Sequence, residues 1–209
     1  MRDDPAGGSA RESPLALKPV VAFPDQIQQK LLKHSSKRIE HPSGGRAAVL
    51  MPIFQKNDEP YLLLTLRTEQ VETHKGQVSF PGGVQEPRDS SLEYTALRET
   101  EEEIGLSPEN VRILGDFDEY LSVTDLVVRP FVGWIEMPVA LKPNPDEVAA
   151  ILEPPLHLFR DESRVRVEKR VRRNEERLVY FYDFNGQEIW GLTAQIIRDF
   201  VAMLDGREH

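Results

Sequence analysis

Cysteine is absent from the 209 residues, and this absence excludes several kinds of chemistry. Disulfide bonds, thiolate nucleophiles and cysteine-based zinc sites all depend on it. No apolar run approaches the roughly 20 residues that a membrane-spanning helix needs. Residues 1–19 also lack the apolar stretch of a signal peptide and carry early acidic residues. We therefore expect a cytoplasmic protein with no membrane partner.

Positive charge is also scarce. The chain has 26 Lys and Arg residues against 35 Asp and Glu residues, which gives a net charge of −9 and a pI of about 5.1. An acidic protein of this kind is not expected to bind nucleic acid or anionic membranes. A function that involves phosphate groups would then need a metal ion and local basic residues.

The composition is that of a globular protein, with 39% hydrophobic and 29% charged residues. The length suits one sizeable domain. Residues 1–19 are rich in Gly, Pro and Ser and are expected to form a flexible leader. We therefore predict a single domain over residues 20–209.

Strand-like segments outnumber helical ones, and the helices are interspersed among them. This order predicts one α/β domain with a mixed β-sheet flanked by helices. The predicted helices are a segment after Asp25, one that Ser90 or Ser91 begins and Gly105 ends, and one near the C-terminus. The predicted strands are 46–54, 61–67, 78–80, 111–117, 119–123, 126–136, 147–152, 164–171 and 177–184.

The segment RETEEEIGL, residues 98–106, carries four glutamates in five positions. Residues three and four apart share one face of a helix, so Glu99, Glu102 and Glu103 are predicted to converge. Glu101 points away from them, toward solvent. Such a face is either solvated or holds a cation, and oxygen ligands alone favour Mg²⁺ or Mn²⁺.

The glycine-containing segment FPGG, Phe80 to Gly83, lies just before this helix. Together the two segments resemble the signature box of the Nudix hydrolases, here at about residues 83–106. The matching positions are Gly83, Arg98, Glu99, Glu102, Glu103, Gly105 and Leu106. Three features depart from the general box: the spacing from Gly83 to Arg98 is one residue longer, Asp89 replaces Glu, and Thr100 replaces an aliphatic residue.

The longer spacing and the upstream segment LLTLRTEQVETHKGQVSFPGG, residues 63–83, resemble the coenzyme A pyrophosphatase branch of that family. Two residues depart from the branch motif. Thr68 replaces a usual Ser or Ala, and Glu72 stands where an arginine is usual. The second change reverses a charge where an anionic substrate is expected, which puts coenzyme A itself in question but not diphosphate hydrolysis.

The resemblance implies a Nudix-type α/β/α sandwich and a role for each matched residue. Glu99, Glu102 and Glu103 would bind Mg²⁺ or Mn²⁺, and Arg98 would orient a box carboxylate. The general base would be Glu147, from a downstream loop, or one of the box residues Glu99 and Glu102. The residues expected to bind substrate are Arg67, Lys75, Gly82 and Gly83.

The leading hypothesis is therefore a metal-dependent pyrophosphohydrolase that cleaves coenzyme A or its derivatives to 3′,5′-ADP and 4′-phosphopantetheine. Another nucleoside diphosphate derivative is the enzymatic alternative, namely ADP-ribose, a dinucleotide or a nucleoside triphosphate. A non-catalytic binding module is less well supported, because Glu99, Glu102 and Glu103 are all retained. The expected partner is a small nucleotide substrate, and a homodimer is left open.

Overall fold

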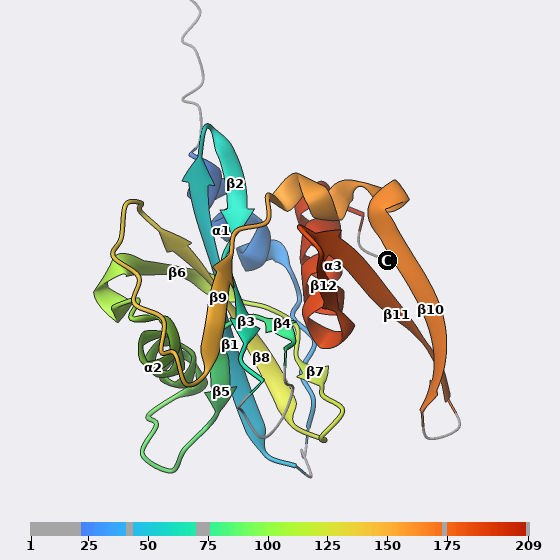
Figure 1. Cartoon of the computed structure of the whole chain (residues 1–209), viewed down its shortest axis with the longest axis horizontal. Helices are drawn as coiled ribbons and strands as arrows, with labels where there is room; N and C mark the ends of the chain where they lie inside the picture. Colours follow the sequence, from blue (N-terminus) through green and yellow to red (C-terminus); the bar gives the residue numbers. More distant parts are fainter. Residues whose placement is uncertain (1–21, 41–43, 70–75, 173–174, 208–209) are drawn as a thin grey trace, which may run out of the picture.

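A computed structural model describes residues 22–40, 44–69, 76–172 and 175–207 (Figure 1). The predicted leader, Glu72 and Lys75 lie outside the described residues.

The centre of the molecule is a six-stranded mixed sheet with the order β2-β1-β8-β6, in which β5 also pairs with β1 and β7 with β8. β1 and β8 run parallel, and the other pairs in this sheet are antiparallel. Its strands are β1 (Arg46–Lys56), β2 (Glu59–Leu62), β5 (Gly82–Val84), β6 (Val111–Asp116), β7 (Tyr120–Leu121) and β8 (Val127–Ile135).

The two central strands send alternate side chains into two separate cores, because successive residues of a strand point to opposite faces. Ala48 and Leu50 of β1 pack against α2 (Leu92–Ile104). Met51 and Ile53 pack on the other face, toward α1 (Phe23–Lys33) and α3 (Gly191–Asp205). Figure 1 shows α2 on one side of the sheet and α3 on the other. The predicted mixed sheet flanked by helices is thus confirmed.

Two smaller sheets complete the fold. One has the order β4-β3-β9 and the other β10-β11-β12. Short 3-10 helices, η1 (Pro108–Asn110), η2 (Leu156–Arg160) and η3 (Glu162–Arg164), connect the larger elements. The strands of the two smaller sheets are β3 (Leu64–Arg67), β4 (Val78–Ser79), β9 (Val148–Leu152), β10 (Val165–Arg172), β11 (Glu175–Phe184) and β12 (Gln187–Trp190).

The single strand predicted at residues 61–67 is wrong, because the chain changes sheet there. β2 pairs with β1, whereas β3 pairs with β4 and β9. Leu63 lies between them, and its backbone N–H donates to the carbonyl oxygen of Pro52 at 3.0 Å. The change of sheet carries Arg67 away from the central sheet and toward α2.

The predicted ends of α2 are confirmed, whereas the predicted start of α1 is not. Ser91 caps α2 by accepting a hydrogen bond from the Tyr94 N–H, and Gly105 ends the helix with a left-handed φ of 68°. α1 instead begins at Phe23, before Asp25, and has Pro24 in its first turn. Proline is tolerated there because the N–H groups of the first turn have no partner within the helix. No helix in the described part of the chain is long and apolar enough to cross a membrane.

Candidate active site

Arg98 lies at the centre of a cluster of three carboxylates on and beside α2. Its Nε and Nη2 donate to the two oxygens of Asp89, both at 3.0 Å. Nη1 donates to Glu102 at 2.8 Å and Nη2 to Glu99 at 2.9 Å. The hydrogen bonds with Asp89 contribute most to raising the pKa of the Arg98 guanidinium, and those with Glu99 add to it, although burial opposes the change. One planar cation therefore holds the side chains of two box glutamates in a defined direction.

Asp89 joins the loop before α2 to this cluster. Its carboxylate also accepts hydrogen bonds from the backbone N–H of Glu86 and from the Thr95 hydroxyl. The hydrogen bonds from Arg98 are the main reason that the pKa of this buried carboxyl falls well below its usual range. Asp89 thus both closes the turn and anchors Arg98.

The two glycines of β5 are needed for different close approaches. A Cβ atom on Gly82, where φ is +148°, would lie 2.3 Å from the carbonyl oxygen of Ala48. A Cβ atom on Gly83 would lie 2.4 Å from the Cδ of Glu99. The absence of a side chain at Gly83 therefore lets the Glu99 carboxylate lie directly on the backbone of β5.

Glu103 is the most buried of the three box glutamates, with 3% of the residue exposed. Its Oε1 lies 3.5 Å from Nη1 of Arg67, and its Oε2 is buried with no hydrogen-bond partner among the described residues. Burial raises the pKa of Glu103 to about 8 and the Glu147 and Glu99 carboxylates add to this change, whereas the Arg67 charge and a hydrogen bond from the Gly82 backbone oppose it. The Nε of Arg67 is also buried, and no described group accepts its hydrogen bond. This pair of half-satisfied charges is a strong sign of a binding site, since such groups are costly unless something else completes them.

Glu147 lies in the turn before β9, close to the box glutamates rather than on an exposed strand edge. The turn is held by bonds from Thr68 N–H to the Glu147 carbonyl oxygen and from the Thr68 hydroxyl to the Asp146 carbonyl oxygen, both at 2.9 Å. Its side chain accepts one long hydrogen bond, from Nδ2 of Asn144 at 3.4 Å. The negative charge of Glu147 contributes to raising the pKa of both Glu99 and Glu103.

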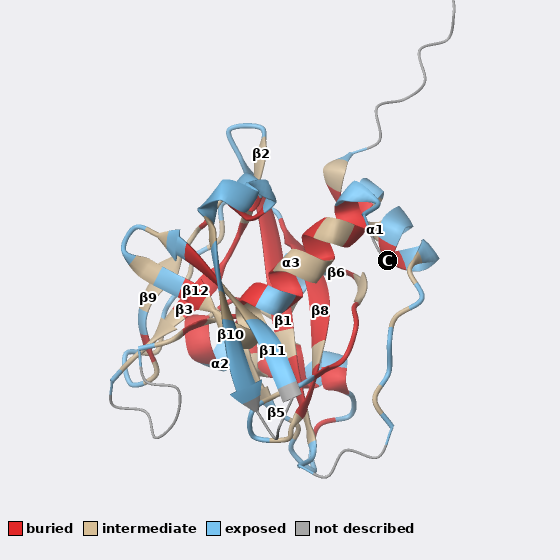
Figure 2. Cartoon of the chain, turned by 90° about the vertical axis from the view of Figure 1, so that its right-hand side faces the viewer, coloured by how far each residue is buried: buried red, intermediate tan, exposed pale blue. Residues whose placement is uncertain are grey.

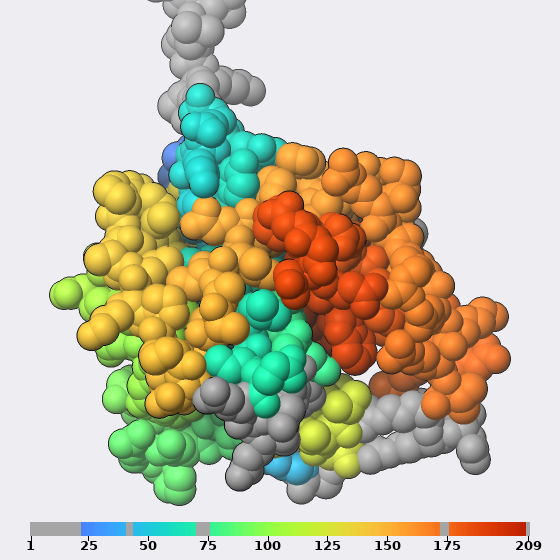
Figure 3. Space-filling view, viewed as in Figure 1, coloured from blue at the N-terminus to red at the C-terminus, as the bar shows by residue number. Residues whose placement is uncertain are grey.

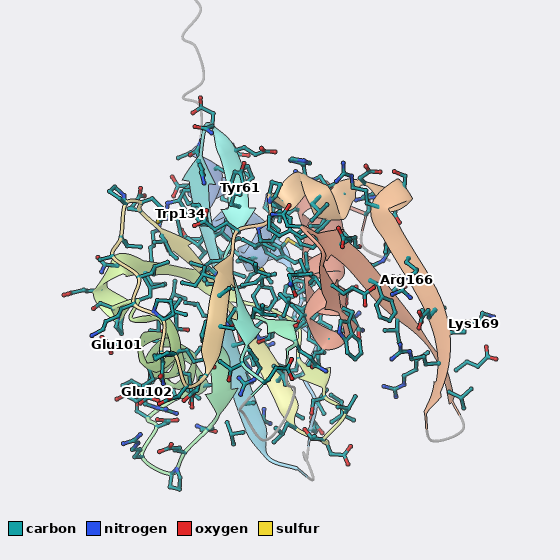
Figure 4. The ribbon with its side chains drawn as sticks, in the orientation of Figure 1. Tyr61, Glu101, Glu102, Trp134, Arg166 and Lys169 are labelled. Atoms are coloured by element: carbon teal, nitrogen blue, oxygen red, sulfur yellow. The ribbon has the colours of Figure 1, made fainter. Side chains whose placement is uncertain are left out.

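The predicted convergence of Glu99, Glu102 and Glu103 is only partly present. Glu102 is exposed and turns toward Arg98 and Arg88, whereas Glu103 turns inward to Arg67. Among the residues that the structure describes, no three acidic or histidine side chains are grouped closely enough to hold a metal ion. Glu101 and Glu102 both face solvent on α2, as predicted for Glu101 (Figure 4). The spacing argument failed for Glu102 because Arg98, on the same helix, draws that side chain away.

The chemistry of these residues nevertheless fits a divalent cation. All the candidate donors are carboxylate oxygens, the ligands that Mg²⁺ and Mn²⁺ prefer. Glu103 has an oxygen that no described group satisfies, and burial raises the pKa of Glu99 despite its bond to Arg98. A nearby cation would stabilise the ionised form of both side chains.

Sequence reasoning missed two residues that support this site. Thr95, fully buried, donates to Asp89, and the backbone N–H of Asn144 donates to the Glu103 carbonyl oxygen at 2.8 Å. Thr95 lies six residues after Asp89, on the predicted helix face that Arg98 also occupies, so the helix pattern held a signal for it. Asn144 is 41 positions from Glu103, and no local pattern joins them.

Comparison with known proteins agrees with this geometry. The protein-family model for the NUDIX domain matches residues 44–174. An uncharacterized Nudix hydrolase, NudL, from Photorhabdus laumondii is 44% identical over 151 residues, which cover 72% of this chain and 80% of the relative. NudL from Pectobacterium atrosepticum is 40% identical over 162 residues, covering 78% and 84% of the two chains. The chain therefore belongs to the Nudix family and is a Nudix hydrolase.

A solved structure supports the fold. The crystal structure of a MutT/nudix family protein from Enterococcus faecalis is similar, with a TM-score of 0.51 at 16% identity. The similarity covers 89% of this chain and 76% of that one. At this identity the comparison shows a shared fold and nothing about the substrate.

Proposed function

We propose that this Nudix hydrolase is a metal-dependent pyrophosphohydrolase that cleaves the diphosphate of coenzyme A or its derivatives. The observation that carries the proposal is the half-satisfied pair of Glu103 and Arg67 beneath the glycine strand β5. A diphosphate with a divalent cation would supply what both groups lack, a cation for Glu103 and anionic oxygens for Arg67. The upstream motif of residues 63–83, which resembles the coenzyme A pyrophosphatase branch, supports coenzyme A, because it supplies Arg67 of this pair and also Gly82, whose backbone bonds to Glu103.

The site residues would have separate roles in binding the metal ion and the substrate. Glu99 and Glu103 would hold Mg²⁺ or Mn²⁺, and Glu102 would join them by turning inward from Arg88. The ion would neutralise phosphate charge and lower the barrier to attack by water. Arg98 would keep Glu99 and Glu102 in place, and Asp89 would keep Arg98 in place. Arg67 would bind a diphosphate oxygen, and the backbone of Gly82 and Gly83, against which Glu99 lies, would border the bound substrate.

We propose Glu147 rather than a box residue as the general base. The carboxylates of Glu99 and Glu102 both accept hydrogen bonds from Arg98, so part of each is already engaged. Glu147 receives one long hydrogen bond and lies beside Glu99 and Glu103. It would take one proton from the attacking water as the water oxygen bonds to one phosphorus. The bridging oxygen would leave on the other phosphate, giving 3′,5′-ADP and 4′-phosphopantetheine.

A second substrate class keeps the same chemistry. Glu72 reverses the charge that the coenzyme A branch usually carries in the upstream motif, which favours a substrate without a 3′-phosphate. ADP-ribose, a dinucleotide and a nucleoside triphosphate are such compounds.

The test is a substrate panel with the full chain, using Mg²⁺ and Mn²⁺ separately. Coenzyme A, dephospho-coenzyme A, ADP-ribose, a diadenosine polyphosphate and ATP would be compared by kcat/KM, with products identified by mass spectrometry. Coenzyme A is expected to rank first, and a chelator is expected to abolish turnover. Glu103→Gln should lose on the order of 10²–10³-fold in kcat, the range for loss of one preorganised electrostatic group.

Two further variants sharpen this test. Glu147→Gln should lower kcat while leaving KM near its wild-type value, as expected for loss of a base rather than of binding. Glu101→Gln is the matched control, because it removes one charge from the exposed side of the same helix and should keep wild-type rates. If another compound of the panel has the highest kcat/KM, that compound would replace coenzyme A as the proposed substrate. Hydrolysis of none of these diphosphates, or a fully active Glu103→Gln, would contradict the pyrophosphohydrolase itself.

A further inference from the structure

The turn that precedes β9, residues 144–147, is joined to the C-terminal end of α2. A helix leaves its last carbonyl groups without partners inside the helix. Here the backbone N–H of Lys142 donates to the Ile104 carbonyl oxygen at 2.7 Å, and that of Asn144 donates to the Glu103 carbonyl oxygen at 2.8 Å. Figure 3 shows the gold surface of the segment before β9 against the green surface of α2. The place of the turn is therefore set by the helix that also carries the box glutamates.

Asn144 makes most of the hydrogen bonds inside this turn. Its carbonyl oxygen accepts the N–H of Glu147 at 3.1 Å and that of Val148 at 2.8 Å. Its Oδ1 accepts the N–H of Asp146 at 3.2 Å, the bond by which an asparagine side chain closes a turn. Its Nδ2 donates to Oε1 of Glu147 at 3.4 Å. An amide can make both side-chain bonds at once, because it carries an acceptor and a donor.

The other side of the turn is bound to the residue that follows Arg67. Thr68 donates from its N–H to the Glu147 carbonyl oxygen and from its hydroxyl to the Asp146 carbonyl oxygen, both at 2.9 Å. Arg67 itself lies 3.5 Å from Glu103. The contacts thus form a closed ring that runs from α2 through the turn to the end of β3 and back to α2.

The pairing of β3 with β9 is irregular at this point. Leu66 pairs with Ala150, whereas Arg67 pairs with Val148, so β9 has one extra residue, Ala149. A bulge of this kind bends a strand and redirects its side chains, often beside an active site. Figure 2 shows β9 near one edge of the molecule, mostly in the colours of half-buried and exposed residues. The turn before β9 is therefore reachable from solvent, and its side chains depend on local hydrogen bonds for their direction.

We propose that Asn144 is a positioning residue for Glu147, an inference that rests on the proposed function and on Glu147 as its general base. Nδ2 of Asn144 engages Oε1 of Glu147, and no described residue donates to Oε2. Oε2 would then be the oxygen that takes the proton of the attacking water. Because Asn144 also bonds to the backbone of Glu103, it holds the base at a fixed place relative to a proposed metal ligand. A misplacement of about 1 Å in such an arrangement can cost on the order of 10²-fold in rate.

Substitutions at Asn144, made alone and together with Glu147→Gln, test this role. Asn144→Ala should lower kcat by about ten- to hundredfold and keep KM within about twofold of the wild-type value. In Glu147→Gln, where the base is already gone, the same substitution should change kcat by less than about twofold, because residues that act as a unit are not additive. Rates would be measured with the compound of the substrate panel that has the highest kcat/KM. Asp146→Asn changes an exposed side chain of the same turn and is the matched control, expected to keep wild-type rates.

Asn144→Asp separates closing the turn from directing the carboxylate. Aspartate keeps an acceptor for the Asp146 N–H, but it has no donor and brings a like charge to Glu147. The Asp146 N–H should therefore exchange with solvent as slowly as in the wild type, while kcat still falls by about tenfold or more. In Asn144→Ala the same N–H should exchange about tenfold faster. A merely structural role predicts instead that Asn144→Asp, which keeps the turn closed, restores kcat.

Equal losses of kcat from Asn144→Ala with and without Glu147→Gln would overturn the proposal, because Asn144 would then act on something other than Glu147. So would an unchanged exchange rate in Asn144→Ala, or a wild-type kcat in Asn144→Asp. A fully active Glu147→Gln would overturn the choice of base and this inference with it. Hydrolysis of none of the diphosphates would contradict the proposed function, whereas hydrogen exchange needs no substrate and decides separately whether Asn144 holds the turn.

Discussion

At the residue scale, Arg98 explains how three carboxylates can lie close together. It makes four hydrogen bonds to Asp89, Glu99 and Glu102, and its own charge is only slightly exposed. Glu103 is outside this arrangement, and its contacts are a hydrogen bond from the Gly82 backbone and the Arg67 guanidinium at 3.5 Å. Of the three box glutamates, Glu103 therefore has the most to gain from a metal ion, and its behaviour with pH is the most informative.

Glu103→Gln is expected to change the pH dependence of stability in metal-free buffer. The folded state keeps Glu103 protonated up to a pKa of about 8, raised by burial, against about 4.5 when exposed. Its contribution to stability is therefore complete below pH 4.5 and is lost as the pH rises to 8, at roughly 1.4 kcal/mol per pH unit. The glutamine variant lacks this loss, so it should be more stable than the wild type at pH 8. Chemical denaturation at several pH values measures the difference.

Adding a metal ion should reverse the order of stability of the wild type and Glu103→Gln at pH 8. Mg²⁺ or Mn²⁺ should stabilise the wild type at pH 8 and leave Glu103→Gln nearly unchanged, because an ion that binds only the folded state stabilises it. Equal metal stabilisation of the two proteins would remove Glu103 from the proposed ligands. Parallel pH profiles would instead show that burial does not shift its ionisation.

At the element scale, β5 and α2 meet through two glycines whose replacement should have different results. Gly83→Ala forces aside the flexible end of Glu99, so folding should be nearly normal while kcat falls. Gly82→Ala forces a Cβ atom against the backbone of β1 at a positive φ, so it should destabilise the fold by about 1–3 kcal/mol. Thermal unfolding and steady-state rates of both variants would be measured together. Loss of stability in Gly83→Ala equal to that in Gly82→Ala would show that Glu99 is held rigidly in place.

Local signals predicted the elements well where each residue's neighbours in sequence decide the structure. Ser91 and Gly105 bound α2 as expected, because capping depends on adjacent backbone groups. The division of residues 59–67 between two sheets could not be predicted, because it depends on partners such as Pro52 and Pro154. The same limit applies to the site. Helix spacing placed Glu99 and Glu103 on α2, but the pairing of Arg67 with Glu103 and the approach of Glu147 arise from long-range strand pairing.

At the scale of the whole molecule, two buried carboxylates, Asp118 and Glu119, connect the segment that follows α1 to the central sheet. Asp118 binds His34 and the Lys37 N–H, and Glu119 accepts a hydrogen bond from the Ile39 N–H at 2.7 Å. The Glu119 side chain, which is fully buried, also binds Arg46 of β1 and Arg129 of β8. One carboxylate thus joins the segment after α1 to both central strands. This network is built from different residues than the site on α2, so the two can be altered separately.

Glu119→Gln is expected to destabilise the fold in a pH-dependent way without altering catalysis. Burial alone would raise the pKa of Glu119, but the hydrogen bonds from Ile39 and Arg129 and the two arginine charges lower it overall. A lowered pKa gives stability that is present above the unfolded value of about 4.5 and is lost as the pH falls through the folded value.

At pH 7 the glutamine variant leaves Arg46 and Arg129 without their anion, so its free energy of unfolding should fall by about 1–3 kcal/mol. The deficit should shrink in acid. Glu153→Gln, which removes the half-buried partner of the exposed Lys56, is the control and should change stability little. Denaturation curves from pH 3 to 8 measure the effect, and a deficit that stays constant in acid would show that the Glu119 charge does not support the fold.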